Sequence, residues 1–253
     1  MLAASNVNYF SQGVNDILDM HLEPKQREAP QGDYLEASKL GVVCSRALQY
    51  EYTHTPRDIW SSGKLLRIFE IDYAIEKMTL NWLRLIGFEI ATHQENGEPL
   101  GFSTADGQIQ GHVDGVIYNF CSRSGFEELS MPAIWECKAI DERFWHEIVE
   151  KGVKLYKPIY AVKIALYQAY MEEKIPGISK NPAVFTTVNK ASADIHHELV
   201  PFDAALAQAA SDKALNILRA TQAGETLPRI SADRKNLECR FCDWKYHCWK
   251  ESI

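Results

Sequence analysis

The sequence predicts an α/β fold in which a mixed central sheet is flanked by helices. Hydrophobic residues make up 46% of the 253 residues, which is enough for a sizeable core. The spacing of apolar residues changes along the chain from the period of helices to that of strands and back again. Charged residues at 24% and aromatic residues at 11% are ordinary for a globular protein. This composition disfavours a disordered chain, a collagen-like repeat and a disulfide-stapled miniprotein.

Residues 1–33 are expected to form an N-terminal arm, followed by a single domain over residues 34–253. The segment Glu23 to Asp33 contains two prolines and a glycine, which predicts irregular structure there. The first twenty residues lack a basic start, an apolar stretch and a cleavage site, so no secretion signal is indicated. No apolar run approaches the roughly 18 residues that a membrane span needs. We therefore expect a cytoplasmic protein that has no membrane partner.

The expected elements follow from local patterns, taken in chain order. Helical spacing predicts one helix from about Ser38 and a longer helix between Ile59 and Ile86, ended by Gly87. Alternating apolar positions then predict antiparallel strands in GFEIATH, PLGFST and GQIQGHVDGVIYNF, and the apolar run AIWECKAI predicts a buried strand. The remaining predictions are helices at Asp141–Glu150 and Pro158–Lys174, strands near Ala183–Val188 and Ile195–Val200, a helix over Phe202–Ala223, and a cysteine-rich tail.

The charge balance removes one simple argument for nucleic-acid binding. The chain has 27 basic and 34 acidic residues, and its formal net charge is −7. It therefore has no general basic surface that would attract phosphate. A cluster of carboxylates that holds a divalent metal also makes a chain acidic, and the metal then supplies the positive charge that meets phosphate. An acidic chain thus remains compatible with a metal-dependent enzyme that acts on nucleic acid.

Two acidic residues and a lysine occupy predicted strands. Asp114 ends a predicted strand in GHVDG, and Glu136 and Lys138 project from the same side of the buried strand AIWECKAI. Burying such charges is costly unless each has a partner or a metal. Two carboxylates and a main-chain carbonyl suit Mg²⁺, which activates water for phosphodiester hydrolysis, and a nearby lysine can assist. A buried Glu136–Lys138 ion pair with Asp114 as a turn residue explains the pattern equally well.

The segments GHVDG, WECKA and ALYQAYM, in this order, resemble the PD-(D/E)XK nuclease superfamily. The resemblance is to its RecB-like branch, which includes the CRISPR-associated iron-sulfur exonucleases and the AddB nuclease domain, and it covers about Tyr34 to Trp249. It implies a restriction-endonuclease-like core and a two-metal site for Mg²⁺ or Mn²⁺. The metal ligands that it implies are Glu76, Asp114, Glu136 and the main-chain carbonyl of Cys137. The catalytic residues that it implies are Asp114, Glu136, Lys138, Gln168 and Tyr170.

The chain departs from this family near Glu76. Many members carry a histidine shortly before the corresponding glutamate as a further metal ligand, and Tyr73 stands at that position here, with Asp72 beside it. Asp72 and Glu76 are four residues apart and can share one helical face. Asp72 could therefore replace the histidine, or both residues could belong to a solvated acidic patch.

Four cysteines form the strongest spacing signal. Cys239, Cys242 and Cys248 follow a C-x2-C-x5-C pattern, and Cys44 lies far upstream. Without a secretion signal, metal binding is a better expectation than disulfides. Four thiolates suit either a 4Fe-4S cluster or a tetrahedral Zn²⁺. The family resemblance favours the 4Fe-4S cluster, which would staple the two ends of the chain together as a clasp. The other two cysteines, Cys121 and Cys137, lack such spacing.

The resemblance implies a DNA exonuclease that acts on single strands or DNA ends with Mg²⁺ or Mn²⁺. Recombination, repair, phage or CRISPR-related DNA processing would be its setting. Two alternatives remain: a structure-specific endonuclease of the same superfamily, and a non-catalytic DNA-binding protein whose nuclease site has decayed. The sequence contains no G-x-x-x-x-G-K-[ST] motif. A helicase, recombinase or CRISPR-adaptation protein would therefore be a separate partner.

Overall fold

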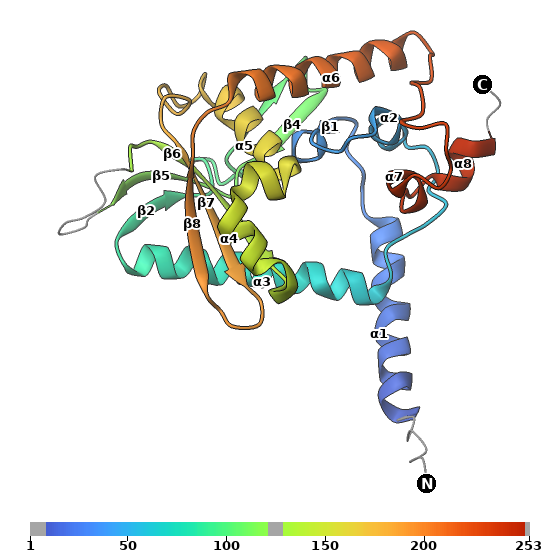
Figure 1. Ribbon diagram of the computed structural model, residues 1–253, viewed down its shortest axis with the longest axis horizontal. Helices are drawn as coiled ribbons and strands as arrows, with labels where there is room; N and C mark the ends of the chain where they lie inside the picture. Colours follow the sequence, from blue (N-terminus) through green and yellow to red (C-terminus); the bar gives the residue numbers. More distant parts are fainter. Residues whose placement is uncertain (1–8, 121–128, 251–253) are drawn as a thin grey trace.

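The fold is built around a five-stranded mixed sheet. The computed structural model describes residues 9–120 and 129–250. The strand order is β2-β5-β6-β7-β8, and neighbouring strands are antiparallel except for the parallel pair β6 and β7. This arrangement confirms the predicted α/β class with a mixed sheet (Figure 1). The strands are β2 Phe88–Ala91, β5 Gly115–Phe120, β6 Ala133–Ile140, β7 Ala183–Asn189 and β8 Ile195–Val200.

A second, smaller sheet joins the first one through a very short connection. Its order is β1-β4-β3, formed by Leu35–Glu36, Ile109–His112 and Gly101–Thr104. Strand β4 ends at His112 and β5 begins at Gly115, so only Val113 and Asp114 lie between the two sheets. The predicted site residue Asp114 therefore stands at the joint between them.

Helices cover both faces of the main sheet (Figure 1). On one face, Trp135 and Cys137 of β6 pack in a core cluster with Leu83 of α3. On the other face, Ile134 packs in a larger core with residues of α5 and α6. The alternation of β6 therefore turns Glu136 and Lys138 away from α3 and puts the Cys137 thiol on the apolar α3 side. The helices are α3 Gly63–Leu85, α4 Glu142–Tyr156, α5 Pro158–Met171 and α6 Ala204–Gln222.

Capping residues fix where these helices begin and end. The Ser62 side chain accepts a hydrogen bond from the Leu65 amide at the start of α3, and Asp203 accepts one from Leu206 at the start of α6. Gly87 and Gly224 follow the ends of α3 and α6 with φ of 104° and 69°, a backbone region that favours glycine. The predicted helix ends at both glycines are confirmed.

The helix expected from Ser38 is wrong in its first half. A 3-10 turn, Ala37–Lys39, covers its expected start, residues 40–44 are not helical, and the helix α2 begins only at Ser45 and ends at Tyr52. The Lys213 ammonium of α6 donates hydrogen bonds to the carbonyls of Leu40 and Val42. These carbonyls are therefore bound by a distant side chain and are not part of a helical ladder. The tertiary contact thus overrides the local pattern.

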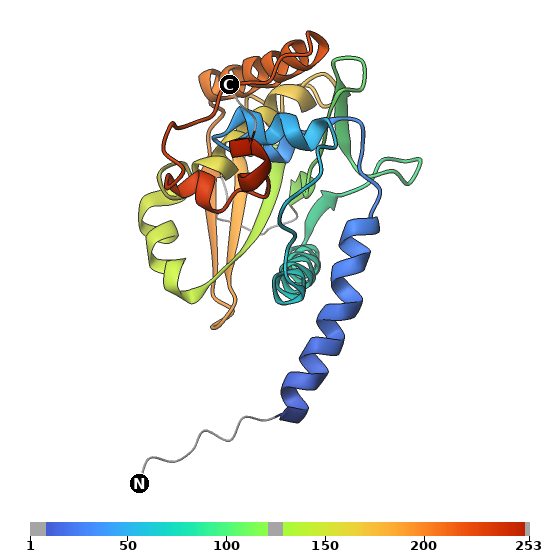
Figure 2. The ribbon, with the colours of Figure 1, turned by 90° about the vertical axis from the view of Figure 1, so that its right-hand side faces the viewer.

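The N-terminal arm is helical where irregular structure was expected. Helix α1 runs over Tyr9–Glu28, includes Pro24 and projects from the body (Figures 1 and 2). Its contacts with the start of α3 include an Asp19–Arg67 ion pair and a hydrogen bond from the Gly63 amide to Glu23 Oε1 at 3.0 Å. These contacts hold the turns of α1 before the proline against α3. No helix among the described residues is long and apolar enough to cross a membrane.

The cysteine-rich tail returns to the N-terminal part of the domain. It contains two short helices, α7 Leu237–Arg240 and α8 Lys245–Lys250, which lie near α2 (Figure 2). The Trp244 indole donates to the Thr55 carbonyl at 2.8 Å, and the Asp58 amide donates to the Asp243 carbonyl at 2.9 Å. The tail is therefore packed against residues about 190 positions away, as the 189-residue separation of Trp244 and Thr55 shows.

Candidate active site

Asp114 is held at the joint between the two sheets. Its Oδ2 accepts a hydrogen bond from the Cys137 backbone amide of β6 at 3.0 Å, and only 12% of its side chain is exposed. Burial alone would raise the pKa of Asp114, but the ammonium groups of Lys163 and Lys138 hold that pKa below its ordinary value. Asp114 is therefore a fixed carboxylate that stays ionised beside β6.

Glu136 and Lys138 meet on the α5 side of β6, as their spacing predicts. Glu136 is fully buried, and its Oε1 lies 2.6 Å from the Lys138 ammonium. The same ammonium lies 3.3 Å from Asp114 Oδ2 and donates to the Cys137 carbonyl at 2.7 Å. Although burial lowers the pKa of Lys138, Glu136 and Asp114 raise it well above its ordinary value. Lys138 is consequently a permanent cation at this position.

Lys163 of α5 is a site residue that sequence reasoning missed. Its ammonium lies 2.6 Å from Glu136 Oε1 and 3.1 Å from Asp114 Oδ1, and the side chain is 9% exposed. The signal for it was present in the sequence, because Lys163 is the charged residue inside the apolar run from Ala161 to Tyr167. A lysine in such a run needs a buried partner, and the structure provides two carboxylates.

Glu76 of α3 lies close enough to the cluster for its pKa to depend on the charges there. Burial, together with the negative charges of Asp114 and Glu136, raises the pKa of Glu76 to about 7. Glu76 therefore lies within electrostatic range of the cluster, on the helix where the sequence predicted a further carboxylate. The neighbouring Asp72 instead forms an ion pair with Lys190, and Tyr73 lies against the Lys77 ammonium, which is 4.4 Å from its ring centre.

The two α5 residues predicted to be catalytic make their polar contacts elsewhere. The Gln168 side chain is buried, and its amide donates to the Asn181 carbonyl at 2.9 Å. The Tyr170 hydroxyl lies 2.6 Å from Ser211 Oγ of α6. Lys163 is instead the α5 residue that contacts the carboxylates. Two tyrosines of α5 lie against the lysines of the cluster: the ring centre of Tyr167 is 5.2 Å from the Lys163 ammonium, and that of Tyr160 is 5.7 Å from the Lys138 ammonium.

A cavity of about 400 Å³ opens beside the cluster. This volume is within the range of pockets that hold small ligands. A ligand in the cavity would reach Asp114, Lys138 and Lys163 directly. Its other walls come from β1, β4, α5 and the turns beside them: Tyr34, Glu36, Ser38, Gln110, His112, Ile159, Tyr160 and Tyr167.

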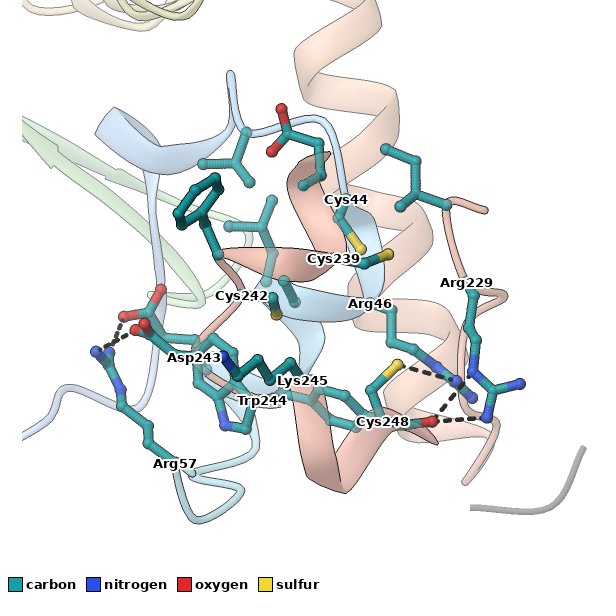
Figure 3. Close-up of a pocket in the computed structure, with 18 of the residues that line it drawn as sticks. Cys44, Arg46, Arg57, Arg229, Cys239, Cys242, Asp243, Trp244, Lys245 and Cys248 are labelled. Atoms are coloured by element: carbon teal, nitrogen blue, oxygen red, sulfur yellow. Dashed lines mark hydrogen bonds and ion pairs between the residues drawn. The ribbon is translucent and has the colours of Figure 1, made fainter. Parts of the chain in front are cut away.

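The four predicted cysteine ligands lie around another cavity of about 400 Å³ (Figure 3). They come from the start of α2, from α7, from the turn after it and from α8: Cys44, Cys239, Cys242 and Cys248. Arg46 donates to the Cys248 sulfur at 3.6 Å. Burial raises the pKa of Cys242 to about 11. Cys137 is buried on the α3 side of the sheet, and Cys121 lies outside the described residues.

The predicted ligands do not surround a metal-sized site in either place, the acidic cluster or the four cysteines. Within residues 9–120 and 129–250, no three His, Cys, Asp or Glu side chains converge closely enough to hold a metal ion. At the acidic cluster the reason is visible, because the ammonium groups of Lys138 and Lys163 lie against the carboxylates. At the cysteines, the sulfur atoms surround a cavity of ligand size.

A chain of ion pairs runs between the two cavities. Its four links have N–O distances of 2.8 to 2.9 Å, and the charges alternate along it: Glu36, Lys39, Glu51, Arg57 and Asp243. Glu36 lines the cavity beside Asp114, and the other four members line the cavity with the four cysteines. The link between Arg57 and Asp243 is drawn in Figure 3.

Comparisons with known proteins bear on the fold. No protein-family model matches the sequence, and no curated protein does either. The crystal structure of LHK-Exo in complex with dAMP is similar, with a TM-score of 0.50 and 12% identity over 76% of this chain and 89% of that chain. Another structure of LHK-Exo, an alkaline exonuclease from Laribacter hongkongensis, gives a TM-score of 0.49 and 11% identity over 83% and 93% of the two chains.

A crystal structure of a protein designated SSO0001 gives a TM-score of 0.45 and 14% identity over 91% of this chain and 94% of that chain. Identities at this level bear on the fold alone. The chain therefore has an α/β fold that resembles the structure of an alkaline exonuclease.

Proposed function

We propose that this chain is a metal-dependent DNA nuclease of the PD-(D/E)XK superfamily that acts as an exonuclease on single strands or DNA ends. The observation that carries the proposal is the meeting of Asp114, Glu136 and Lys138 beside a ligand-sized cavity. A fold hosts many activities, so the site must carry the functional argument. Two carboxylates can hold a metal that activates water for phosphodiester hydrolysis, and a lysine beside them can stabilise the charge that develops on the phosphate.

The donor set at this site fits Mg²⁺ or Mn²⁺. Asp114, Glu136 and the Cys137 carbonyl would hold the metal, and Glu76 would complete the set with a further oxygen donor. Burial, together with the charges of Asp114 and Glu136, raises the pKa of Glu76, and a divalent cation beside it would favour its ionised form. When bound, the metal would lower the pKa of a water molecule and neutralise charge on the phosphate.

The residues of the chain have separate tasks in this proposal. The backbone amide of Cys137 donates to the Asp114 carboxylate and so orients it. Cys137 and Glu136 are neighbours on β6, so this bond also fixes the Asp114 carboxylate relative to Glu136. The raised pKa of Lys138 keeps it protonated at neutral pH. It therefore acts as a hydrogen-bond donor and fixed positive charge toward a phosphate oxygen, and not as a general base. The cavity beside these groups is where the DNA backbone would enter.

We also propose that Cys44, Cys239, Cys242 and Cys248 hold a 4Fe-4S cluster, with Zn²⁺ as the alternative. The four sulfur atoms line a cavity of about 400 Å³. A single Zn²⁺, with Zn–S bonds of about 2.3 Å, would need the sulfur atoms within roughly 4 Å of one another. A 4Fe-4S cluster is larger than a single metal ion, and a cavity of this volume leaves room for it. Its contribution would be structural, because it would tie α2 to the tail and close a long loop of chain.

The proposed substrate is DNA. The LHK-Exo structure that contains dAMP shows that protein with a unit of DNA, and the two folds are similar. A mononucleotide is the unit that an exonuclease releases. The polar and aromatic walls of the cavity beside Asp114 suit a nucleotide better than an apolar ligand.

The decisive experiment is cleavage of end-labelled single-stranded DNA and covalently closed circular DNA, with Mn²⁺ or Mg²⁺, after anaerobic purification. The wild type would be compared with Lys138→Ala and with Lys154→Ala, a control at an exposed lysine that pairs with Asp203 on the surface. Release of nucleotides from linear DNA by the wild type and the control, but not by Lys138→Ala, would support the proposal. Nicking of the circular DNA would instead identify an endonuclease, and tight DNA binding without cleavage at either metal would identify a non-catalytic binding protein.

A further inference from the structure

The acidic cluster contains one more cation than the proposed hydrolysis requires. Lys138 accounts for the lysine expected beside the two carboxylates, yet Lys163 also reaches them from α5. Its ammonium lies 2.6 Å from Glu136 Oε1 and 3.1 Å from Asp114 Oδ1, with the side chain only 9% exposed. A buried lysine is retained in a fold only when its partners compensate for the lost hydration. Lys163 therefore has a defined place in the cluster.

The charges explain what that place is. Asp114 and Glu136 contribute two negative charges, and Lys138 and Lys163 contribute two positive charges, so the four groups are neutral together. The carboxylate oxygens that would bind a metal already face ammonium groups. A divalent cation placed among them would lie close to both ammonium groups and would be repelled by them. One ammonium has to leave before the metal can be held tightly.

The geometry distinguishes the two lysines. Lys138 lies on the same strand as Glu136 and also donates to the Cys137 carbonyl at 2.7 Å, an oxygen whose second lone pair remains for a metal. Lys163 comes from a different element, and beyond the two carboxylates it contacts the ring of Tyr167, whose centre is 5.2 Å from its ammonium. Its side chain also lines the cavity beside Asp114. An ammonium that leaves the carboxylates from α5 can therefore stay in the cavity wall.

We infer that Lys163 is a built-in counter-ion of the metal site, which neutralises Asp114 and Glu136 before metal binds and is displaced by the metal. This inference rests on the proposed nuclease function. Lys163 is a positioning residue in this account: it holds the two carboxylates together in the metal-free protein. After displacement its charge lies in the cavity where a phosphate would approach, so it changes partners from carboxylate to substrate.

The test is a titration of the whole protein with Mn²⁺, without DNA, so that no turnover is needed. The variants are Lys163→Gln and Lys163→Met, which remove the charge and keep most of the side-chain volume, and Lys163→Arg, which keeps the charge. We expect Mn²⁺ to bind about tenfold or more tightly to the first two, because the competing charge is gone. Lys163→Arg and the surface control Lys154→Gln should bind Mn²⁺ as the wild type does.

A second readout separates competition from a structural role. In EDTA, Lys163→Gln and Lys163→Met should melt at lower temperature than the wild type, because Glu136 is left buried with fewer partners. Saturating Mn²⁺ should raise the melting temperature of these variants more than that of the wild type. If either variant fails to fold in EDTA, its refolding on addition of Mn²⁺ would likewise show that the metal stabilises the uncharged site more than it stabilises the wild type.

The outcomes distinguish this inference from the proposed function. Wild-type affinity for Mn²⁺ in the Lys163→Gln and Lys163→Met proteins, with only lowered stability, would overturn the role of Lys163 and leave the metal site intact. Absence of Mn²⁺ binding in the wild type and in every variant would overturn the metal site and the inference together. Weaker binding in the uncharged variants would show that Lys163 supports the metal, which is the opposite of the inference.

Discussion

Lys138 has three acceptors around its ammonium group, and each of them belongs to the proposed metal site. Replacing it by alanine removes a fixed positive charge and leaves the backbone of β6 unchanged. We expect Lys138→Ala to reduce the DNA cleavage rate by about 10²-fold or more, the usual effect of losing a preorganised electrostatic donor. Single-turnover assays would measure this, and unchanged DNA affinity would assign the loss to the chemical step. A variant that cleaves at the wild-type rate would contradict the role of Lys138.

Glu76 makes the stability of the metal-free protein depend on pH. Its pKa is raised from 4.5 to about 7 in the folded state, so the folded protein keeps a proton that the unfolded chain releases. The stability that Glu76 contributes is full below about pH 4.5 and falls as the pH rises through about 7. Glu76→Gln should remove this fall. In EDTA, the free energy of unfolding of the variant should therefore exceed that of the wild type by an amount that grows with pH.

Thermal melts at about pH 5 and about pH 8 in EDTA would measure this difference. Glu98→Gln, a change at an exposed residue of the loop before β3, is the control. Equal pH dependence in the wild type and Glu76→Gln would show that Glu76 does not titrate with the cluster.

At the residue scale, the sequence identified the charges on strands better than the charge on a helix. Alternation along one strand predicts that Glu136 and Lys138 share a side, and the structure confirms this. Whether Lys163 reaches the same point depends on how α5 lies across the sheet, which local pattern does not determine. The polar contacts of Gln168 and Tyr170, with Asn181 and Ser211, are likewise set by packing. Their predicted catalytic roles remain predictions.

Among the elements, the segment before α2 shows how packing replaces a helix. Gly41 lies against α5 so closely that an added Cβ would be 2.7 Å from the Ile159 Cα and 2.8 Å from its carbonyl oxygen. Gly41→Ala should therefore destabilise the protein by about 1–3 kcal/mol, because backbone atoms cannot move aside cheaply. Urea denaturation would measure the change.

Gly13 provides the matched control for this prediction. It lies inside α1, and an added Cβ would meet nothing within 4 Å. Gly13→Ala should stabilise the helix by about 0.5–1 kcal/mol, because alanine loses less backbone entropy than glycine. Similar effects of the two substitutions would contradict the close packing of Gly41 on α5.

The strands and long helices were predictable because their signals are local. Alternation marks β8 and apolar runs mark the buried strands β6 and β7. A cap and a glycine mark the ends of α3. The failures share a physical feature. The carbonyls of residues 40 and 42 are bound by Lys213 of α6, and Asp19 and Glu23 of α1 are bound by residues at the start of α3. Both depend on partners far away in the sequence.

For the whole molecule, the proposed clasp makes a prediction about metal content. Cys44→Ser should lose the bound metal and be about 2–4 kcal/mol less stable, the usual effect of opening a cross-link that closes a long loop. Iron, sulfide and zinc analysis of anaerobically purified protein would measure the content, and denaturation would measure the stability. Cys137→Ser, at a buried thiol outside the clasp, should keep its metal. Full metal content in Cys44→Ser would contradict the clasp.

The chain of ion pairs from Glu36 to Asp243 joins the walls of the two cavities, so we expect a change of charge in one cavity to affect the other. Each inner member shares its charge between two neighbours, so removing one end makes the remaining charges redistribute their partners. Substitutions at Asp243 and at Glu36 should therefore have effects that do not add, although the two residues belong to opposite ends of the sequence. The effect of a substitution in this network would then depend on the other charges of the network. Single substitutions measured one at a time would therefore underestimate how strongly the N-terminal and C-terminal parts of the chain depend on each other.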